Sequence, residues 1–444
     1  MKILRWPANF FRGLFLFLFV LVVGLIYGLG RLGLWLTVRD RQHRERRVAR
    51  WQGRTLRRSM TLLGATFIKM GQVLSSRPDL LKPEIIDELR VLQDRLPAFG
   101  FGRVRKIVEA DLGKTIEEMF TEFDERPVAA ASVAQVHRAR LRDGTEVAVK
   151  VLRPNVRRAV ERDSGILLVG AKLMTISPKA RMSDPVGHLR HFVEAIIAQT
   201  DLRLEADHYE RFAKNFAGDA NIVFPGIHRA YCTQRVLTME FMRGTRFDDR
   251  DRAHDKVLAA IVRNMMFKMC FDDGFVHADL HPGNFLVNAA GTGLIVFDAG
   301  MAKLLGDDVL LQFIDFSRCL TTGTADDFVA HVRRFHNYVG EIDWDAFRAD
   351  IVPLLATFRD LNSAKLEYSQ LFADIFKIAR THKARPVVDL TLVMVAMVTA
   401  QGIGQVLDPE SNVFGEVAGY LMPLLAKKGL LAKLMQQQAT APAA

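Results

Sequence analysis

The sequence predicts an α+β protein with a small β-containing lobe, a larger helical lobe, a helical N-terminal extension and an N-terminal transmembrane helix. Three observations lead to this fold class. Residues 13–30 form an uncharged apolar run, the hydrophobic pattern changes to period two over residues 127–152, and helical periodicity dominates most of the remainder. A chain of 444 residues exceeds one ordinary core, so at least two lobes are expected.

Composition narrows the class of protein. The chain is 49% hydrophobic and 25% charged, which is typical of a globular protein. Cys232, Cys270 and Cys319 lie far apart, which argues against a disulfide framework or zinc knuckle and fits a reducing compartment. The net charge of +11 indicates an anionic partner, either lipid headgroups or nucleic acid.

The apolar run at 13–30 is long enough to cross a bilayer. As a helix it measures roughly 27 Å, close to the ~30 Å hydrocarbon core. Basic residues are denser after it than before it, which predicts a single N-terminal span with a cytoplasmic C-terminal side. Arginines continue through 39–58 and suit an anionic leaflet, so nucleic acid is not needed to explain the charge. A cleaved signal peptide and an in-plane interfacial helix are the alternatives.

The remaining elements follow from periodicity and turn residues. Helices are predicted at 55–75, 83–96, 102–120, 157–175, 186–216 and 254–272. Strands are predicted within 127–152, turning at Asp143-Gly144, and at 235–241, 284–288 and 293–297. The apolar stretch 387–403 contains Asp389 and is interpreted as a core helix. The predicted domains are a membrane anchor with basic juxtamembrane segment (1–54), a helical extension (55–120), a first lobe (121–245), a helical lobe (246–435) and a disordered tail (436–444).

Two isolated residues carry chemical information. In "EVAVKVLRP", Lys150 shares an apolar strand face with Ala148, and a lysine there needs an anionic partner. Glu205, on the helix predicted at 186–216, is the candidate. In "GLIVFDAGM", Asp298 leaves a buried strand beside a glycine turn, a good position for Mg²⁺. An edge-strand lysine and an ordinary turn aspartate remain the plain alternatives.

The stretch "FVHADLHPGNFLVN" at 275–288 concentrates His277, Asp279, His281 and Asn284. One interpretation is a metal cluster with both histidines as ligands, but it leaves Lys150 and Asp298 without a role. In the other, Asp279 orients an acceptor and Asn284 holds a metal. The set Lys150, Glu205, Asp279, Asn284 and Asp298 then occurs in the order that a protein-kinase-like site requires. His277 becomes an orienting residue of the loop, and His281 contacts the loop or a phosphate.

Longer motifs support the second interpretation. The chain resembles the UbiB/AarF-type atypical kinases, linked to ubiquinone biosynthesis, over about residues 60–415. The matching segments are "KMGQVLSSRPDLL" (69–81), "AAASVAQVH" (129–137), "VAVKVLRP", "EADHYERFAKN", "HADLHPGN" and "QGIGQVLDPE". The resemblance implies a protein-kinase-like two-lobe fold with a helical N-terminal K-x-G-Q extension.

The resemblance also implies roles. Asp279 takes the catalytic-base position, Lys150 pairs with Glu205, and Asn284 and Asp298 bind Mg²⁺. The implied nucleotide contacts are Ala129, Ala130, Ala131, Ser132, Val133, Lys150, Glu240 and Met242. Lys69 and Gln72 belong to the extension, which is thought to restrict protein substrates.

The implied activity is that of a membrane-anchored kinase or ATPase using ATP or ADP with Mg²⁺ and supporting ubiquinone or related isoprenoid-lipid biosynthesis. The expected partners are membrane lipids, both anionic headgroups and isoprenoid quinone precursors. Proteins of a biosynthetic complex and a second copy of the chain are possible further partners, and nucleic acid is not expected. The expected location is a bacterial inner membrane with a cytoplasmic catalytic domain. A nucleotide-binding scaffold and a small-molecule phosphotransferase are the alternative functions.

Three features depart from the family's pattern. Ala299 follows Asp298 where phenylalanine is usual, which removes a packing side chain and is expected to loosen the metal loop. Thr200 stands where a glutamate is usual. The apolar anchor comes first, whereas familiar bacterial members place membrane helices at the C-terminus.

Overall fold

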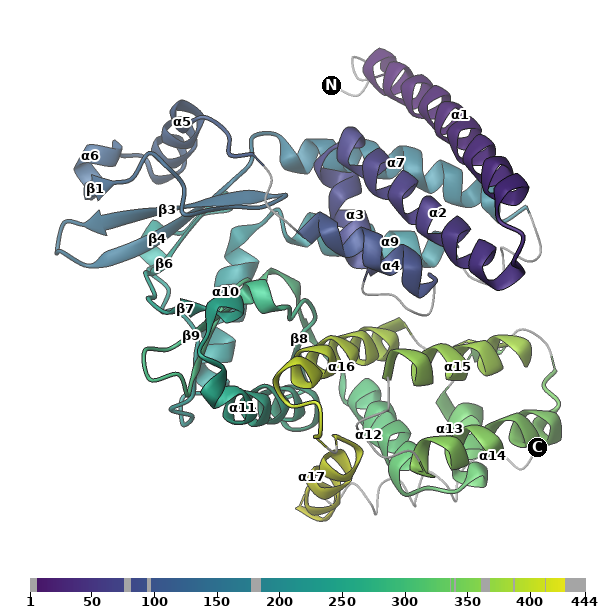
Figure 1. Ribbon diagram of the computed structural model, residues 1–444. Helices are drawn as coiled ribbons and strands as arrows, with labels where there is room; N and C mark the ends of the chain where they lie inside the picture. Colours follow the sequence, from purple (N-terminus) through teal and green to yellow (C-terminus); the bar gives the residue numbers. More distant parts are fainter. Residues whose placement is uncertain are drawn as a thin grey trace. The chain divides into compact units, whose positions relative to one another are not determined.

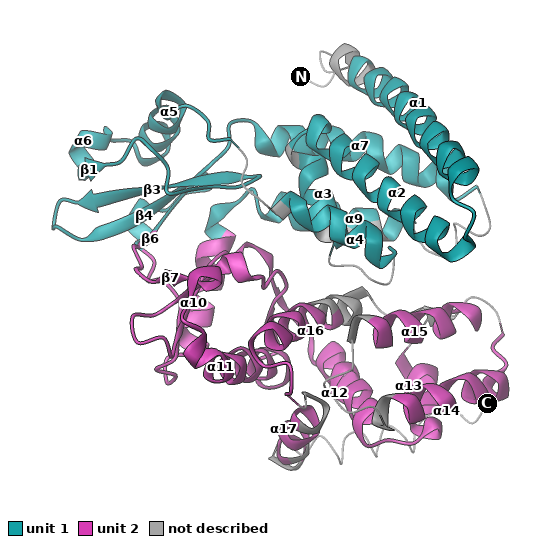
Figure 2. Cartoon of the chain, in the orientation of Figure 1, with its two compact units in different colours: residues 1–203, 228–238 teal, residues 204–227, 239–444 magenta. Residues whose placement is uncertain are grey.

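The computed structural model describes residues 6–75, 81–93, 97–176, 185–335, 337–338, 341–360, 368–385, 388–411 and 413–427. The chain forms two compact units (Figure 2). Unit 1 contains Met1–Arg203 and His228–Thr238, and unit 2 contains Leu204–Ile227 and Met239–Ala444.

Unit 1 contains most of a five-stranded sheet. Its strands are β1 (Phe120–Phe123), β2 (Ala129–Ala130), β3 (Ala134–Leu141), β4 (Glu146–Leu152) and β6 (Val236–Glu240), in the order β1-β3-β4-β6 with β2 beside β3. The predicted hairpin turn is confirmed: β3 and β4 pair across it, and Gly144 has φ 91°, a conformation that glycine adopts without strain. Val147, Val149 and Val151 are fully buried in a core shared with the two preceding helices, at Phe101–Leu112 and Ile116–Met119.

The rest of unit 1 is helical (Figure 1). Its helices are α1 (Trp6–Thr37), α2 (Arg41–Leu63), α3 (Ala65–Ser75), α4 (Pro83–Arg90), α5 (Phe101–Leu112), α6 (Ile116–Met119), α7 (Val156–Met174) and α9 (Pro185–Ala198). An apolar cluster joins α1, α2, α3 and α4, with Leu16, Met60, Phe67 and Leu89 among its buried members. The predicted start of a helix at Pro83 is confirmed; Ser76–Leu80, where the preceding break was predicted, lie outside the described residues.

Three predicted helices are divided in the structure. The helix predicted from 55 to 75 breaks at Gly64, which has φ 99°, and the one predicted at 102–120 breaks at Gly113, which has φ 71°. A capping box between Thr115 and Glu118 then starts α6. The helix predicted at 186–216 is α9 and α10 (Leu202–Asn215), separated where the Leu202 N–H donates to Gln234 O at 3.0 Å. Apolar periodicity continues across these breaks, so it did not reveal them.

Unit 2 contains most of α10 and several short strands. One sheet runs β5 (Ile222–Val223), β10 (Leu294–Val296), β9 (Phe285–Val287), β7 (Thr245–Arg246), and another pairs β8 (Phe275–His277) with β11 (Ala302–Leu304). The predicted β9–β10 hairpin is confirmed, with Gly291 at φ 75°. The pair β8–β11 was not predicted, because three-residue strands leave no periodic signal.

The helices of unit 2 complete its core. They are α11 (Asp255–Phe267), continued by a π-helical turn (Lys268–Asp272), then α12 (Asp307–Thr321), α13 (Ala325–Phe335), α14 (Trp344–Asp360), α15 (Tyr368–Thr381), α16 (Val388–Leu407) and α17 (Val413–Lys427). Val393, Met394 and Ala396 of α16 are buried, as expected for a core helix. Among the described residues, one helix, Phe11–Thr37, is long and apolar enough to cross a membrane.

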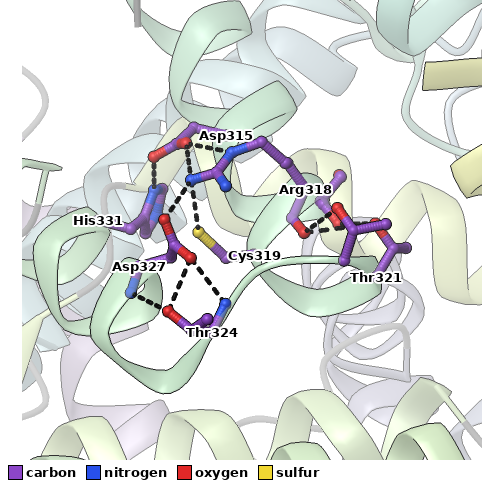
Figure 3. A network of polar contacts seen from close by, with 9 residues as sticks. Asp315, Arg318, Cys319, Thr321, Thr324, Asp327 and His331 are labelled. Atoms are coloured by element: carbon purple, nitrogen blue, oxygen red, sulfur yellow. Dashed lines mark hydrogen bonds and ion pairs between the residues drawn. The ribbon is translucent and has the colours of Figure 1, made fainter. Parts of the chain in front are cut away.

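A buried polar network joins α12 to α13 (Figure 3). His331 Nδ1 lies 2.9 Å from Asp315 Oδ2, and both side chains are almost fully buried. Arg318 Nη2 donates to Asp315 Oδ1 at 3.0 Å and to Asp327 Oδ1 at 3.3 Å. Asp327 in turn accepts from the Thr324 N–H at the start of α13. The network therefore fixes the helix pair through charged groups that are satisfied within unit 2.

Candidate functional site

The loop after β8 is organised by a neutral histidine. His277 is fully buried, and burial lowers its pKa. Its Nδ1 accepts the Asp279 N–H at 3.3 Å, so the proton is on Nε2, which donates to Phe297 O at 3.2 Å. Both ring nitrogens are thus engaged, and His277 orients the loop, as the second sequence interpretation expected.

Asn284 closes the same loop. Its Nδ2 donates to Asp279 O at 2.9 Å, and its own N–H donates to His281 O at 2.9 Å. Because the amide nitrogen faces the backbone, the side-chain oxygen is the atom presented for other contacts. His281 Nδ1 accepts the Gly283 N–H at 3.1 Å, so His281 shapes the turn at Pro282–Asn284.

The Asp298 loop is held by α10. Asp298 has φ 57° and ψ 58°, the left-handed conformation that few non-glycine residues adopt. Its N–H donates to Tyr209 Oη at 2.8 Å. His208 Nδ1 donates to Ala299 O at 2.8 Å, and burial lowers the pKa of His208. Two consecutive residues of α10 therefore hold two consecutive residues of the loop.

Backbone bonds join the two loops. The Phe297 N–H donates to Asn284 O at 2.8 Å, and the Ala278 N–H donates to Met301 O at 2.7 Å. Unit 2 therefore brings the segments that carry Asp279, Asn284 and Asp298 side by side, although the three residues span 20 positions of sequence. Glu205 lies on α10 of the same unit and is buried.

Unit 1 contains Lys150 and the alanine-rich loop. Lys150 is 9% exposed on β4, with fully buried valines on the opposite strand face. The alanine-rich loop follows β2: the Ala131 N–H donates to Ala134 O at 2.8 Å, and Ser132 is buried. Arg153 fixes this loop, because its Nε donates to Ala131 O at 2.9 Å and its Nη2 to Pro97 O at 2.8 Å.

The remaining predicted residues are distributed over both units. On α3 in unit 1, Lys69 is buried and Gln72 donates to Leu92 O at 2.8 Å. Glu240 ends β6 with its N–H on Gly226 O at 2.8 Å, and Met242 follows it in unit 2. Because Lys150 belongs to unit 1 and Glu205 to unit 2, their pairing stays a prediction.

The chemistry of these donors suits Mg²⁺ bound with a nucleotide. Among the described residues, no three histidine, cysteine or acidic side chains group as a metal site, which is evidence against the cluster of His277 and His281. Mg²⁺ takes oxygen ligands and is usually held by one or two protein groups together with phosphates and water. Asn284 and Asp298 supply such oxygens from adjacent segments, so they fit the ion that the sequence predicts.

Two residues of the site were missed in the sequence. His208 and Tyr209 follow Glu205 by three and four positions and therefore share its face of α10. That spacing was the available signal, and it lay within the quoted motif "EADHYERFAKN". Their backbone targets are 89 and 91 positions away, which no local pattern reveals.

Comparison with known proteins identifies the family. Residues 91–327 match the ABC1 atypical kinase-like domain, and residues 353–412 match the UbiB helical domain. The chain is 31% identical to the probable protein kinase UbiB of Pseudomonas paraeruginosa, covering 89% of this chain and 77% of that one. It is 30% identical to the corresponding protein of Aeromonas hydrophila, covering 83% and 70%. It is also 30% identical to the uncharacterized protein sll1770 of Synechocystis, covering 86% and 66%.

A solved structure is also similar. The complex of Rv3197 with erythromycin from Mycobacterium tuberculosis is 21% identical, with a TM-score of 0.49 over 77% of this chain and 92% of that one. The two family matches and the bacterial UbiB relatives agree with the sequence motifs and with the loops of unit 2. The chain belongs to the ABC1/UbiB family of atypical kinase-like proteins.

Proposed function

We propose that the chain is a membrane-anchored atypical kinase or ATPase that uses Mg-ATP and supports ubiquinone or related isoprenoid-lipid biosynthesis. One observation carries the proposal: neutral His277 and the backbone bonds beside it join the Asp279–Asn284 loop to the Asp298 loop within unit 2. An orienting carboxylate and two metal-binding oxygens are the groups that phosphoryl transfer requires.

Each residue then has a defined task. Asp279 accepts a hydrogen bond from the attacking hydroxyl or water and positions it. Asn284 and Asp298 hold Mg²⁺, which when bound neutralises the charge that develops on the phosphates. Lys150, oriented by Glu205, binds the phosphates, and Ala129 to Val133 cover them, with Glu240 and Met242 also contacting the nucleotide. Lys69 and Gln72 lie on the extension that would restrict larger substrates.

The setting is proposed from the N-terminal segment and the relatives. The length and apolar character of α1 support attachment to a bacterial inner membrane as a single N-terminal span, with both units cytoplasmic. Anionic lipids and isoprenoid quinone precursors are the proposed partners, with biosynthetic-complex proteins and a second copy as further candidates.

Thermal unfolding of the detergent-purified chain tests the nucleotide site. We expect ATP and ADP to raise the Tm more with Mg²⁺ than without it, because a ligand that binds only the folded state stabilises it. Asp298→Asn should lose the Mg²⁺-dependent part, whereas Asp308→Asn, an exposed carboxyl change on α12, should keep it. No shift in wild type would refute nucleotide binding.

A second measurement separates the enzyme from a scaffold. Asp279→Asn should keep the nucleotide shift and lose phosphate release or transfer in the presence of lipids. If wild type binds Mg-ATP but shows no turnover with lipids, the scaffold function replaces the enzyme. Turnover of a soluble alcohol with no lipid dependence would favour a small-molecule phosphotransferase.

A further inference from the structure

The membrane helix α1 is bonded to unit 1 near its beginning. Arg12 Nε lies 3.2 Å from Asp163 Oδ1, and Arg12 Nη2 lies 3.2 Å from Asp163 Oδ2 and 3.2 Å from Leu63 O. Asp163 is on α7, and its side chain is only 3% exposed. A fork of this kind on a buried carboxylate is a specific contact. It holds the start of α1 against the end of α2 and the middle of α7.

Two further contacts lie along α1. Leu16 is 7% exposed and belongs to the apolar cluster that contains Phe67 and Leu89. Gly30 lies so close to the Trp51 ring of α2 that a Cβ at position 30 would overlap the ring. Unit 1 therefore contacts α1 near both ends of its apolar run.

These contacts cannot exist while α1 crosses a bilayer. Arg12 and Gly30 are 18 residues apart, which is roughly 27 Å along a helix and close to the ~30 Å hydrocarbon thickness. In a span they would lie near opposite faces of the membrane. Asp163, Phe67 and Trp51 all belong to unit 1, so they could not reach both ends.

Outside these contacts, the described surface of α1 is exposed and apolar over most of its circumference. Its exposed large side chains are Phe11, Leu14, Phe15, Phe17, Leu18, Val20, Leu21, Val22, Leu25, Ile26, Leu29, Leu32, Trp35 and Leu36. A continuous apolar surface of this extent is not stable in water. The adjoining α2 presents exposed arginines at 41, 46, 47, 50, 54 and 58. An apolar helix beside a helix with exposed arginines matches a bilayer surface rich in anionic lipid.

We infer that α1 has a docked state in which it lies in the plane of the cytoplasmic bilayer surface, with its apolar face in lipid and the Arg12–Asp163 pair holding it on unit 1. A span is then a second state, reached only when this pair opens. The inference rests on the proposed membrane attachment and is independent of the catalytic proposal.

Thiol labelling tests the docked state in the full-length chain. Gly13 has open space where a Cβ would be, so Gly13→Cys places a reporter thiol next to Arg12 without disturbing it. The chain is expressed in bacteria, and a membrane-impermeant maleimide is added to spheroplasts or to inverted vesicles. Docked α1 keeps the reporter thiol on the cytoplasmic side, so labelling should be strong in the vesicles and weak from outside. A spanning α1 gives the opposite pattern, and the chain without the reporter measures the background from its native cysteines.

The ion pair is tested by variants in this background. Asp163→Asn should increase labelling from outside about fivefold, the size expected from losing one charge-assisted pair. Glu161→Gln is the matched control, because Glu161 is on the same helix and pairs with Arg157 at an exposed position. Arg162 Nε also lies 3.0 Å from Asp163 Oδ1, so the pair is tested from its other side as well. Arg12→Gln removes the charge on α1 and should increase labelling from outside to the same extent as Asp163→Asn, with both variants recovered folded in the membrane fraction.

Two outcomes would overturn the inference. In one, the reporter thiol is labelled from outside to the same extent in the parent reporter chain, Asp163→Asn and Glu161→Gln, which means that α1 only spans. In the other, Asp163→Asn and the control give equal protection, which means that the ion pair does not hold α1. If the chain is absent from membranes altogether, the membrane proposal fails first, and this result is distinguishable from both.

Discussion

Removing one oxygen from Tyr209 should weaken Mg²⁺ binding without affecting the nucleotide itself. Tyr209 is 1% exposed, and its Oη accepts the Asp298 N–H at 2.8 Å. Tyr209→Phe keeps the ring and its packing but leaves this N–H without its acceptor. Asp298 is already in the left-handed conformation, with φ 57°, so the loop depends on such bonds to stay there.

The expected loss of Mg²⁺ affinity follows from two free-energy costs, that of the unsatisfied N–H and that of the left-handed backbone. An unsatisfied donor costs about 1–3 kcal/mol when buried, and Asp298 is only partly buried, so about 1 kcal/mol is the appropriate figure. The left-handed conformation costs roughly another 1 kcal/mol, which the intact bond now offsets. Together these terms amount to about 2 kcal/mol, which would raise the apparent Mg²⁺ dissociation constant by up to about thirtyfold.

The assay is the Mg²⁺ concentration at which the nucleotide-dependent rise in Tm is half complete. Tyr209→Phe should increase this concentration, while the shift with nucleotide alone stays at the wild-type value. Tyr231→Phe is the control, because Tyr231 packs on Phe120 in unit 1, whereas the Asp298 loop belongs to unit 2.

His208 gives an independent check of the same idea. His208→Asn retains a side-chain N–H donor for Ala299 O and should be milder than His208→Ala. If Tyr209→Phe leaves the Mg²⁺ midpoint unchanged, the loop does not depend on α10, and the reasoning from backbone strain is refuted.

Three further predictions concern stability and the alanine-rich loop. Burial lowers the pKa values of His277 and His331 from 6.5, so both histidines stay neutral in the folded chain and bind protons on unfolding. The free energy of unfolding therefore falls as the pH falls below 6.5, by up to about 1.4 kcal/mol per pH unit for each histidine. His331→Gln should reduce this dependence on pH, measured by thermal unfolding at several pH values. Arg153→Ala removes the bonds to Ala131 O and Pro97 O and should weaken nucleotide binding about fivefold with or without Mg²⁺, measured by the same Tm titrations; a purely Mg²⁺-dependent effect would contradict this. Gly113→Ala should lower the free energy of unfolding in urea by about 1 kcal/mol because Gly113 has φ 71°, whereas Gly102→Ala, with open space for a Cβ, should not.

The sequence predicted those features that local chemistry determines. Asp143-Gly144 and Gly291 mark hairpin turns because glycine there adopts a positive φ, and the structure has both hairpins. Asp298 was predicted to follow a buried apolar strand beside a turn, and the structure places it just after β10 and before the turn at Ala299–Met301, while its Mg²⁺ role stays a prediction. Such features depend on a few neighbouring residues, so one sequence contains enough information to find them.

The features that escaped prediction depend on distant partners. The break between α9 and α10 occurs where the Leu202 N–H finds Gln234 O, a residue 32 positions away. Apolar periodicity continues through Thr200, so a single helix was the natural expectation. The contacts of α1 were not predicted for the same reason. An uncharged run predicts a membrane helix, but it does not reveal the contact of Arg12 with Asp163, which is 151 positions away.

The break before α10 also helps to explain how the Asp298 loop is held although Ala299 stands where phenylalanine is usual. Because α10 starts anew at Leu202, its orientation is independent of α9, and one face presents Glu205, His208 and Tyr209 together. Ala299 removes a side chain that was expected to hold the loop by packing. In its place, hydrogen bonds from His208 and to Tyr209 fix the backbone on both sides of the Asp298–Ala299 peptide. Hydrogen bonds to the backbone fix a loop in direction as well as in distance, so replacing the aromatic contact does not require a looser Asp298 loop.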